Sequence, residues 1–323
     1  MFEYRWLFAT NCGRSQQAID LCARMLIEPG DPVVMEEPGY ILARQSFLAV
    51  GSQIIETPVD EQGLLTQHLP AQSTTLAYVT PSHQFPLGGV MPIARRRELL
   101  AWAQHNDAWI VEDDYDGEFR YGLHPVDALQ SIDEAGTVIY VGTFSKALSP
   151  QMRLGYMVLP VQLIAAFRQA KRLADRHTPR SEQLVLAALI SSGAYERHVR
   201  RNRRKNEQRR TALLRAIKLH LPSDTQVEGA ASGLHLVVWL GSLQAHHEAA
   251  LVECARSHDV GVWSITPMYA AGQIFRQHPC AGLVLGYAGL ELREIEEGVK
   301  RLAAALARLA QGIPSMGFKA VVN

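Results

Sequence analysis

The chain has 323 residues, of which 47% are hydrophobic, and its 32 lysines and arginines balance its 32 aspartates and glutamates. A chain of this length can form a large core, and one large domain with a smaller one is the natural division. The balanced charge provides no overall field that would attract nucleic acid or an anionic membrane surface. We therefore expect an ordinary globular protein.

The cysteines and the hydrophobic segments indicate the cellular environment. Four cysteines are scattered without the close spacing of a zinc site or a disulfide framework. No stretch approaches the roughly twenty apolar residues that cross a membrane, and the first residues lack the apolar segment of a secretory signal. These observations predict a cytoplasmic protein with reduced thiols, no metal site and no membrane segment.

Residues 14–160 show helical and strand patterns in alternation. Helical spacing predicts helices over Ser15–Leu26, Tyr40–Ala49 and Ile93–His105, the last with a polar face of Arg95, Arg96 and Arg97. Short apolar runs predict strands over Pro32–Met35, Gln53–Thr57, Thr75–Val79, Ala108–Glu112 and Thr137–Val141. Such alternation predicts an α/β fold, in which helices sandwich a mostly parallel sheet.

The rest of the chain begins with a long helical stretch over residues 161–221, which the pattern predicts to break near Thr178 and Pro179. Its basic residues are compatible with a nucleic-acid patch, but aromatic residues do not alternate with them, so a solvated face of a connecting helix is favoured. They are Arg197, Arg200, Arg201, Arg203, Arg204, Lys205, Arg209 and Arg210. After Pro222 we expect strands over 233–240, 261–265 and 283–287, and helices over 246–258 and 292–309. The pattern predicts a large domain over residues 1–210 and a smaller α+β domain over residues 211–323.

One lysine stands directly after the last strand predicted in the first half of the chain. Lys146 follows Gly142-Thr143-Phe144-Ser145 and precedes Arg153 by seven residues. A lysine amine forms a Schiff base when it is deprotonated, and burial near other cations favours that form. Thr143 and Ser145 can donate hydrogen bonds to a phosphate group, and the guanidinium of Arg153 suits the same dianion. The pattern points to pyridoxal 5'-phosphate, a phosphorylated aldehyde, as the cofactor.

A carboxylate is expected beside this cofactor, because its ring nitrogen must stay protonated to accept electrons from a substrate carbanion. Asp113 stands at the tip of the strand that precedes the strand of Lys146. Ligands of open parallel sheets bind beyond the carboxyl ends of the strands, and both residues fall there. The alternative is a solvated acidic loop, because Glu112, Asp114 and Asp116 surround Asp113.

Four further residues are candidates for binding the phosphate and the ring. Ser15 and Gln16 open the first predicted helix, where backbone N–H groups attract a dianion, although a serine at this position is commonly only a helix cap. Tyr40 is a candidate to stack on the ring, and Tyr115 to form a hydrogen bond with its phenolic oxygen. Either tyrosine is equally compatible with a place in the core.

Five segments occur in the order in which they stand in a known family. They are Ser15-Gln16-Gln17-Ala18, Glu36-Glu37-Pro38-Gly39-Tyr40, Thr80-Pro81-Ser82-His83-Gln84-Phe85-Pro86, Glu112-Asp113-Asp114-Tyr115-Asp116 and Gly142-Thr143-Phe144-Ser145-Lys146. Over about residues 13 to 310, the chain resembles the aminotransferase-like domain of MocR-type regulators, a branch of the GntR family built on fold type I aminotransferases.

The resemblance implies a homodimeric pyridoxal phosphate protein whose sites lie near the subunit boundary. It implies that Lys146 forms the Schiff base and that Asp113 pairs with the ring nitrogen. The residues that it implies around the phosphate are Arg153, Thr143, Ser145, Ser15 and Gln16.

The start of the chain departs from the family pattern. Complete MocR-type proteins carry a winged helix-turn-helix, a linker and further aminotransferase residues before the Ser-Gln-Gln motif, where this chain has only residues 1–12. We therefore expect an N-terminally incomplete domain that does not bind operator DNA by that route.

Two further departures concern catalysis. Val284 stands in the last predicted strand where type I aminotransferases usually place the arginine that binds the substrate carboxylate, and an apolar side chain cannot pair with a carboxylate. Phe85-Pro86-Leu87-Gly88 replaces the Asn-Pro-Thr-Gly motif, which removes the amide that usually touches the ring oxygen. His83 or Gln84 is a candidate substitute, and a loop histidine without a role is the alternative.

Three functions are compatible with these features. The first is a pyridoxal phosphate-binding domain that senses a small amino compound or the cofactor itself for a transcriptional regulator. The second is an active transaminase of amino acids, in which Arg44 or Arg276 would have to bind the carboxylate. The third is a non-functional remnant or a dimerisation module.

Overall fold

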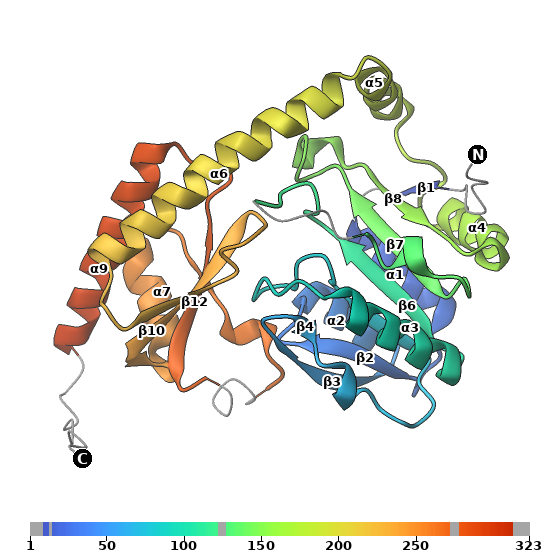
Figure 1. The fold of residues 1–323 in the computed structure, drawn as a ribbon, viewed down its shortest axis with the longest axis horizontal. Coiled ribbons are helices and arrows are strands. Elements are labelled where there is room, and N and C mark those ends of the chain that lie inside the picture. Colours follow the sequence, from blue (N-terminus) through green and yellow to red (C-terminus); the bar gives the residue numbers. More distant parts are fainter. Residues whose placement is uncertain (1–8, 13–14, 122–126, 272–277, 313–323) are drawn as a thin grey trace. The chain divides into compact units, whose positions relative to one another are not determined.

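The chain folds into two compact units. The computed structural model describes residues 9–12, 15–121, 127–271 and 278–312. The first unit contains the described residues up to Lys205, together with Gly229–Leu234 and Pro267–Ala270. The second contains Asn206–Glu228, His235–Thr266 and the described residues from Ala271 onward. Figure 1 labels their helices and strands.

The first unit is built on an eight-stranded sheet with the order β1-β8-β7-β6-β5-β2-β3-β4. Its five central strands β7, β6, β5, β2 and β3 pair in parallel, whereas β8, β1 and β4 join in antiparallel pairs. The predicted mostly parallel sheet is confirmed. The strands are β1 (Ala9–Cys12), β2 (Pro32–Glu37), β3 (Gln53–Asp60), β4 (Gly63–Leu64), β5 (Leu76–Val79), β6 (Trp109–Asp114), β7 (Val138–Thr143) and β8 (Gly155–Val158).

Helices cover both faces of this sheet. On one face, α1 (Ser15–Leu26), α2 (Ile41–Ala49) and α4 (Ile164–Asp175) enclose a core with β2, β5, β6, β7 and β8. On the other face, α3 (Ile93–Asn106) packs on β2, β5 and β6. Because side chains alternate between the faces along each strand, Val111 faces α1 and Ile110 faces α3.

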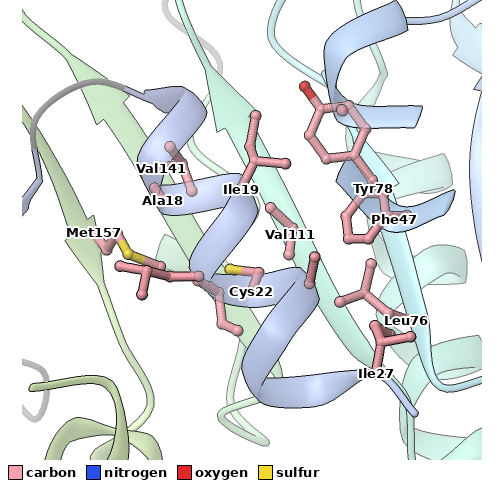
Figure 2. Packing of buried hydrophobic residues seen from close by; sticks show 14 of the residues in the cluster. Ala18, Ile19, Cys22, Ile27, Phe47, Leu76, Tyr78, Val111, Val141 and Met157 are labelled. Carbon is pink, nitrogen blue, oxygen red and sulfur yellow. The ribbon is translucent and has the colours of Figure 1, made fainter. Parts of the chain in front are cut away.

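Helix α1 lies across the strands that carry the candidate site. Its buried residues Ala18, Ile19 and Cys22 recur at helical spacing, and Figure 2 shows them against Val141 and Val111. Full burial of one large aliphatic side chain contributes about 1.5–3 kcal/mol. This packing fixes the first turn of α1 relative to β6 and β7.

The long helical stretch breaks twice, where the sequence predicts one break. α4 ends at Asp175, α5 spans Arg180–Ser191, and α6 spans Ala194–His220. The second break comes at Gly193, whose φ of +68° lies in the left-handed region that glycine adopts readily. The remaining short turns are η1 (Thr66–His68), η2 (Gln130–Ile132), η3 (Pro150–Met152), η4 (Val161–Leu163), η5 (Ala245–His247) and η6 (Thr266–Met268).

The predicted polar face of α3 is wrong at Arg96, which is fully buried. Its guanidinium donates hydrogen bonds of 2.8–3.0 Å to the carbonyl oxygens of Pro81, Met91 and Asp127, and lies 3.6 Å from the carboxylate of Glu112. A buried guanidinium is tolerated because its donors are paired in this way. The spacing within one helix could not reveal these partners, since they come from other segments.

The second unit has an antiparallel sheet with the order β11-β12-β10-β9. Its strands are β9 (Thr225–Glu228), β10 (His235–Gln244), β11 (Trp263–Ser264) and β12 (Cys280–Gly286). Residues of α7 (Glu248–Ser257), α9 (Leu292–Gly312) and the second half of α6 enclose a core against one face of this sheet. Among the helices of the described residues, none has the length and hydropathy needed to span a membrane.

Candidate functional site

The ends of β6 and β7 bring Asp113 and Lys146 to one edge of the sheet. The two strands are parallel neighbours, with Asp113 paired to Val141, and Lys146 stands three residues beyond Thr143, where β7 ends. Burial raises the pKa of Asp113, and the positive charge of Lys146 acts against this rise, so the two side chains interact electrostatically. The lysine and the carboxylate therefore lie together, as the order of the strands predicts.

The start of α1 lies at the same edge. β1 and β7 are both antiparallel to β8, so β1 runs parallel to β7 and ends at the edge where β7 ends. Helix α1 begins at Ser15, shortly after β1 ends at Cys12. The N–H groups of its first turn and its positive dipole end therefore lie beside the ends of the central strands.

Asp113 is buried and incompletely satisfied. The hydroxyl of Tyr78 donates to one carboxylate oxygen over 2.7 Å, while the other oxygen has no hydrogen-bond partner among the described residues. The pKa of Asp113 is raised to about 7, chiefly by burial. The hydrogen bond of Tyr78 and the charge of Lys146 act against this rise, whereas the charges of Asp114 and Asp116 add to it. A cationic N–H group, such as a protonated ring nitrogen, would suit the unpaired oxygen.

The turn after β7 presents the lysine and two hydroxyls. Lys146 is exposed, whereas Thr143 is buried and its hydroxyl accepts the backbone N–H of Ser145 over 3.2 Å. The Ser145 hydroxyl oxygen is buried without a partner in the described part of the chain. Buried polar atoms are normally paired, so this hydroxyl is available to a ligand such as a phosphate.

Arg153 lies between η3 and β8, beside this turn. Gly155 pairs with Thr143 across the antiparallel strands, and Arg153 stands two residues before Gly155, so it lies at the same edge. Its side chain is exposed and its φ is +50°, a left-handed value uncommon for a residue other than glycine. The cation and the exposed lysine thus share the edge at which the hydroxyls lie.

Ser15 and Gln16 occupy the first turn of α1, but Gln16 has a structural contact as well. Its side-chain amide donates to the hydroxyl of Ser46 over 2.9 Å and to the carbonyl of Leu42 over 3.3 Å, which ties α1 to α2. The amide oxygen of Gln16 is buried and has no partner among the described residues. Ser15 is half-buried at the first helical position.

The aromatic candidates form a connected group. The Phe85 ring meets Tyr40 at 5.7 Å and Tyr115 at 5.8 Å between centroids, both edge to face. The Tyr115 hydroxyl lies 2.8 Å from Nδ1 of His83, and burial followed by the charge of Asp116 raises the pKa of Tyr115 well above its usual value. Tyr40, Phe85, Tyr115 and His83 therefore form one connected aromatic cluster, and Tyr40 and Tyr115 are the two residues that the sequence predicts beside the cofactor ring.

Burial and contacts decide two questions that the sequence leaves open: whether the acidic loop is solvated, and whether His83 or Gln84 replaces the missing amide. The solvated acidic loop is wrong for Glu112, Asp113 and Asp116, which are all buried. The side-chain amide of Gln84 already has partners, since it donates to the carbonyl of Pro38, which follows β2, over 2.8 Å and to that of the adjacent Phe85 over 2.7 Å. Of the two substitutes for the missing amide, His83 is the one that contacts Tyr115.

The two arginines named for a substrate carboxylate have different positions. Arg44 in α2 forms ion pairs with Glu37 and Glu56, so its charge is already matched. Arg276 lies outside the described residues. Val284 is buried in β12 opposite Val237, on the face of the small sheet away from the core that α7 and α9 enclose.

Sequence reasoning missed two residues that shape the site. Tyr78 pairs with Val111 in the register of β5 and β6, and it thereby reaches Asp113 two residues further on. Glu36 is buried at the end of β2, where Thr80 and Gln84 donate to it, and burial raises its pKa to about 7. The sequence carried a signal for Glu36, namely the acidic pair in the Glu-Glu-Pro-Gly-Tyr segment. The position of Tyr78 could be predicted only from the register of β5 and β6.

The fold and the family of the chain agree with this geometry. Residues 11–302 match the family described as aminotransferase class I and II. The chain belongs to this family, and its fold is similar to that of solved fold type I aminotransferases. One is the α-aminoadipate aminotransferase LysN of Thermus thermophilus, complexed with N-(5'-phosphopyridoxyl)-L-leucine. Its TM-score is 0.85 at 30% identity, over 94% of this chain and 78% of that chain. Another is the kynurenine aminotransferase of Pyrococcus horikoshii, with a TM-score of 0.84 at 30% identity, over 93% of this chain and 75% of that chain.

The curated relatives include both regulators and enzymes. The uncharacterized HTH-type transcriptional regulator YhdI of Bacillus subtilis is 37% identical over 90% of this chain and 60% of its own length. The probable rhizopine catabolism regulatory protein MocR of Rhizobium meliloti is 36% identical over 91% of this chain and 58% of its own length. The 2-aminoadipate transaminase of Thermus thermophilus is 32% identical over 90% of this chain and 73% of its own length. The chain thus spans about 60% of the length of these regulators.

Proposed function

We propose that this chain binds pyridoxal 5'-phosphate as a Schiff base on Lys146 and forms the effector-sensing domain of a MocR-type regulator of the GntR family. The observation that carries the proposal is the buried carboxylate of Asp113, which has one unpaired oxygen and interacts with Lys146 at the edge where β6 and β7 end. When bound, the cofactor supplies a ring that accepts electrons from a carbon atom next to an amine.

The residues at this edge match the parts of that cofactor. Asp113 would pair with the ring nitrogen, and a cation there would lower its pKa from about 7, so that the carboxylate stays ionised. Tyr40 would stack on the ring, and Tyr115 would contact the ring oxygen. The phosphate would meet the hydroxyls of Thr143, Ser145 and Ser15, the guanidinium of Arg153 and the first turn of α1 with Gln16.

A sensor is favoured over an enzyme by the residue at position 284. The aminotransferase pattern has an arginine there for the substrate carboxylate, and valine offers no charge to bind it. The similarity to YhdI and MocR supports the same conclusion, because both are regulators. The ligand would be a small amino compound whose amine reacts at the cofactor. The proposal includes a homodimer in the cytoplasm, with the division into domains of residues 1–210 and 211–323.

The proposal is tested by the absorption spectrum of the purified chain with added pyridoxal phosphate. A band in the near-ultraviolet or visible range is expected for the native protein and for Lys218→Ala, which removes an exposed lysine of α6. Lys146→Ala should lose the band. A band that survives in Lys146→Ala, or no band in the native protein, would contradict the proposal.

An active transaminase is the second candidate, and the similarity to the 2-aminoadipate transaminase favours it. Steady turnover of an amino donor with a keto acid acceptor would support it. If the sensor proposal holds, the native chain exchanges amines at the cofactor without repeated turnover. Val284→Arg should then increase the affinity for α-amino acids, because it restores a cation at the position of the family arginine.

A further inference from the structure

His83 is held in the aromatic part of the candidate site by a carboxylate. Its ring is buried, and Nδ1 lies 2.9 and 3.2 Å from the two carboxylate oxygens of Asp116, which is also buried. The same Nδ1 lies 2.8 Å from the hydroxyl oxygen of Tyr115. One ring nitrogen therefore meets both the carboxylate and the phenol.

The surrounding backbone leaves this ring little freedom. A Cβ at Gly233 would overlap with Cε1 of His83, and a Cβ at Gly88 would lie 3.1 Å from its Nε2. Both glycines have a positive φ, of +80° and +82°, which other residues adopt with strain. Two glycines thus let the backbone close against the imidazole and fix its plane.

The contacts also determine which nitrogen carries the proton. A carboxylate only accepts hydrogen bonds, so Nδ1 facing Asp116 must carry hydrogen. The phenol oxygen of Tyr115 then accepts from the same N–H, and its own hydrogen is left to point elsewhere. A hydroxyl that accepts one hydrogen bond becomes a stronger donor in another.

We propose that His83, oriented by Asp116, is a positioning residue that holds the Tyr115 hydroxyl as a donor toward the ring oxygen of pyridoxal phosphate, in place of the amide missing from Phe85-Pro86-Leu87-Gly88. This inference rests on the proposed function, because it assigns a role toward the cofactor proposed there. If His83 has this role, its replacement affects the cofactor only through the phenol oxygen of Tyr115. If its role is merely structural, the replacement affects the cofactor whether or not that oxygen is present.

The experiment combines a spectroscopic readout with a double-mutant cycle. The pH midpoint of the cofactor band is measured in the native protein, His83→Gln, Tyr115→Phe and the double variant. A donor at the ring oxygen stabilises the form with more negative charge there, so its loss moves the midpoint upward. We expect roughly one unit for Tyr115→Phe and about half a unit for His83→Gln, with no further shift in the double variant.

A conservative variant and a second site provide rescue and control. The side-chain nitrogen of asparagine occupies the place of Nδ1, whereas glutamine cannot place a donor there. The midpoint in His83→Asn should therefore lie close to that of the native protein, unlike the midpoint in His83→Gln. Asp116→Asn should shift the midpoint in the same direction by a smaller amount, and this shift should also vanish with Tyr115→Phe. The exposed His105→Gln serves as the matched control and should leave the midpoint unchanged.

The outcomes separate this inference from the proposed function. A native protein without a cofactor band overturns both. A native band whose midpoint does not move in His83→Gln, or moves equally with and without Tyr115, overturns the inference alone. Nitrogen-15 spectra of the cofactor-free protein give an independent reading, because they should show His83 with hydrogen on Nδ1. Hydrogen only on Nε2 would overturn the inference whatever the band does.

Discussion

Glu112 and Asp113, adjacent residues at the end of β6, point to opposite faces of the sheet and differ in how many hydrogen-bond donors surround them. Glu112 points toward the α3 face, where the backbone N–H groups of Leu129 and Gln130 donate to its two oxygens over 2.8 and 2.9 Å, and Arg96 lies nearby. Asp113 points toward the α1 face and has one donor, Tyr78, with the other oxygen unpaired among the described residues. Burial raises the pKa of each acid to about 7.

This difference separates a structural acid from a candidate site acid. Burial and a raised pKa are common to both, so neither property identifies a site. What distinguishes Asp113 is the missing hydrogen-bond partner, since buried polar atoms normally have one. Of Glu112 and Asp113, the carboxylate with an unpaired oxygen is the one expected to meet a ligand.

The largest expected effect comes from Glu112→Ala. This change leaves the guanidinium of Arg96 buried without its carboxylate and frees two backbone donors, which should lower the free energy of unfolding by about 3–5 kcal/mol. Denaturant unfolding of the cofactor-free protein measures it. A loss as small as that of an exposed control such as Glu253→Ala would mean that Glu112 is not structural.

Asp113→Asn should behave in the opposite way. An amide keeps the volume and removes only the charge that would pair with the ring nitrogen, so we expect cofactor binding to weaken roughly 10- to 100-fold. In acidic solution, where the fold keeps Asp113 protonated, the free energy of unfolding should change by less than about 1 kcal/mol, because the amide replaces a neutral acid and leaves no partner unpaired. Titration with pyridoxal phosphate and denaturant unfolding give the two values. If Asp113→Asn lowers the free energy of unfolding as much as it weakens cofactor binding in kcal/mol, the difference between a structural acid and a site acid is wrong.

The raised pKa values also predict how stability depends on pH. The usual values are 3.8 for an aspartate and 4.5 for a glutamate, against about 7 for Asp113 and Glu112 in the fold. Between these values the folded protein retains protons that the unfolded chain has released, so stability falls as pH rises toward 7. The slope is roughly 1 kcal/mol per pH unit for each group. Unfolding of the cofactor-free protein across this range should show the decline, and Asp113→Asn should reduce its slope.

The smallest expected effect is that of Tyr78→Phe. It removes the one hydrogen bond to Asp113, which should cost about 1 kcal/mol of stability and raise the pKa of Asp113 further. Denaturant unfolding and the pH profile of the variant measure the two effects. Phe47→Leu, which alters the ring packed beside Tyr78, is a control for packing alone. If Tyr78→Phe leaves the pH profile unchanged, the hydrogen bond does not bear on Asp113.

The sequence predicted the parts of the fold that depend on local periodicity. The five parallel strands and the helices α1, α2 and α3 follow from apolar runs and helical spacing, and their order places Asp113 and Lys146 at one edge. Strand β8 was missed because it is four residues long and begins with a glycine. The edge strands β1 and β4, of four and two residues, were missed as well, because neither is long enough to show a periodicity.

Contacts between distant segments could not be predicted. The partners of Arg96 come from positions 81, 91 and 127, so an arginine in a charged run was placed on the surface. The contact between Tyr78 and Asp113 depends on the register of β5 and β6. The roles of Lys146, Arg153 and the other candidate residues stay predictions until a cofactor is bound.

The central claim is the covalent attachment at Lys146. The native chain is incubated with pyridoxal phosphate, reduced with borohydride and digested, and the peptides are analysed by mass spectrometry. We expect one phosphopyridoxyl group on the peptide that contains Lys146, and none on that peptide when Asp113→Asn is treated at low cofactor concentration. A label spread over exposed lysines such as Lys218 and Lys300, without enrichment at Lys146, would contradict the account.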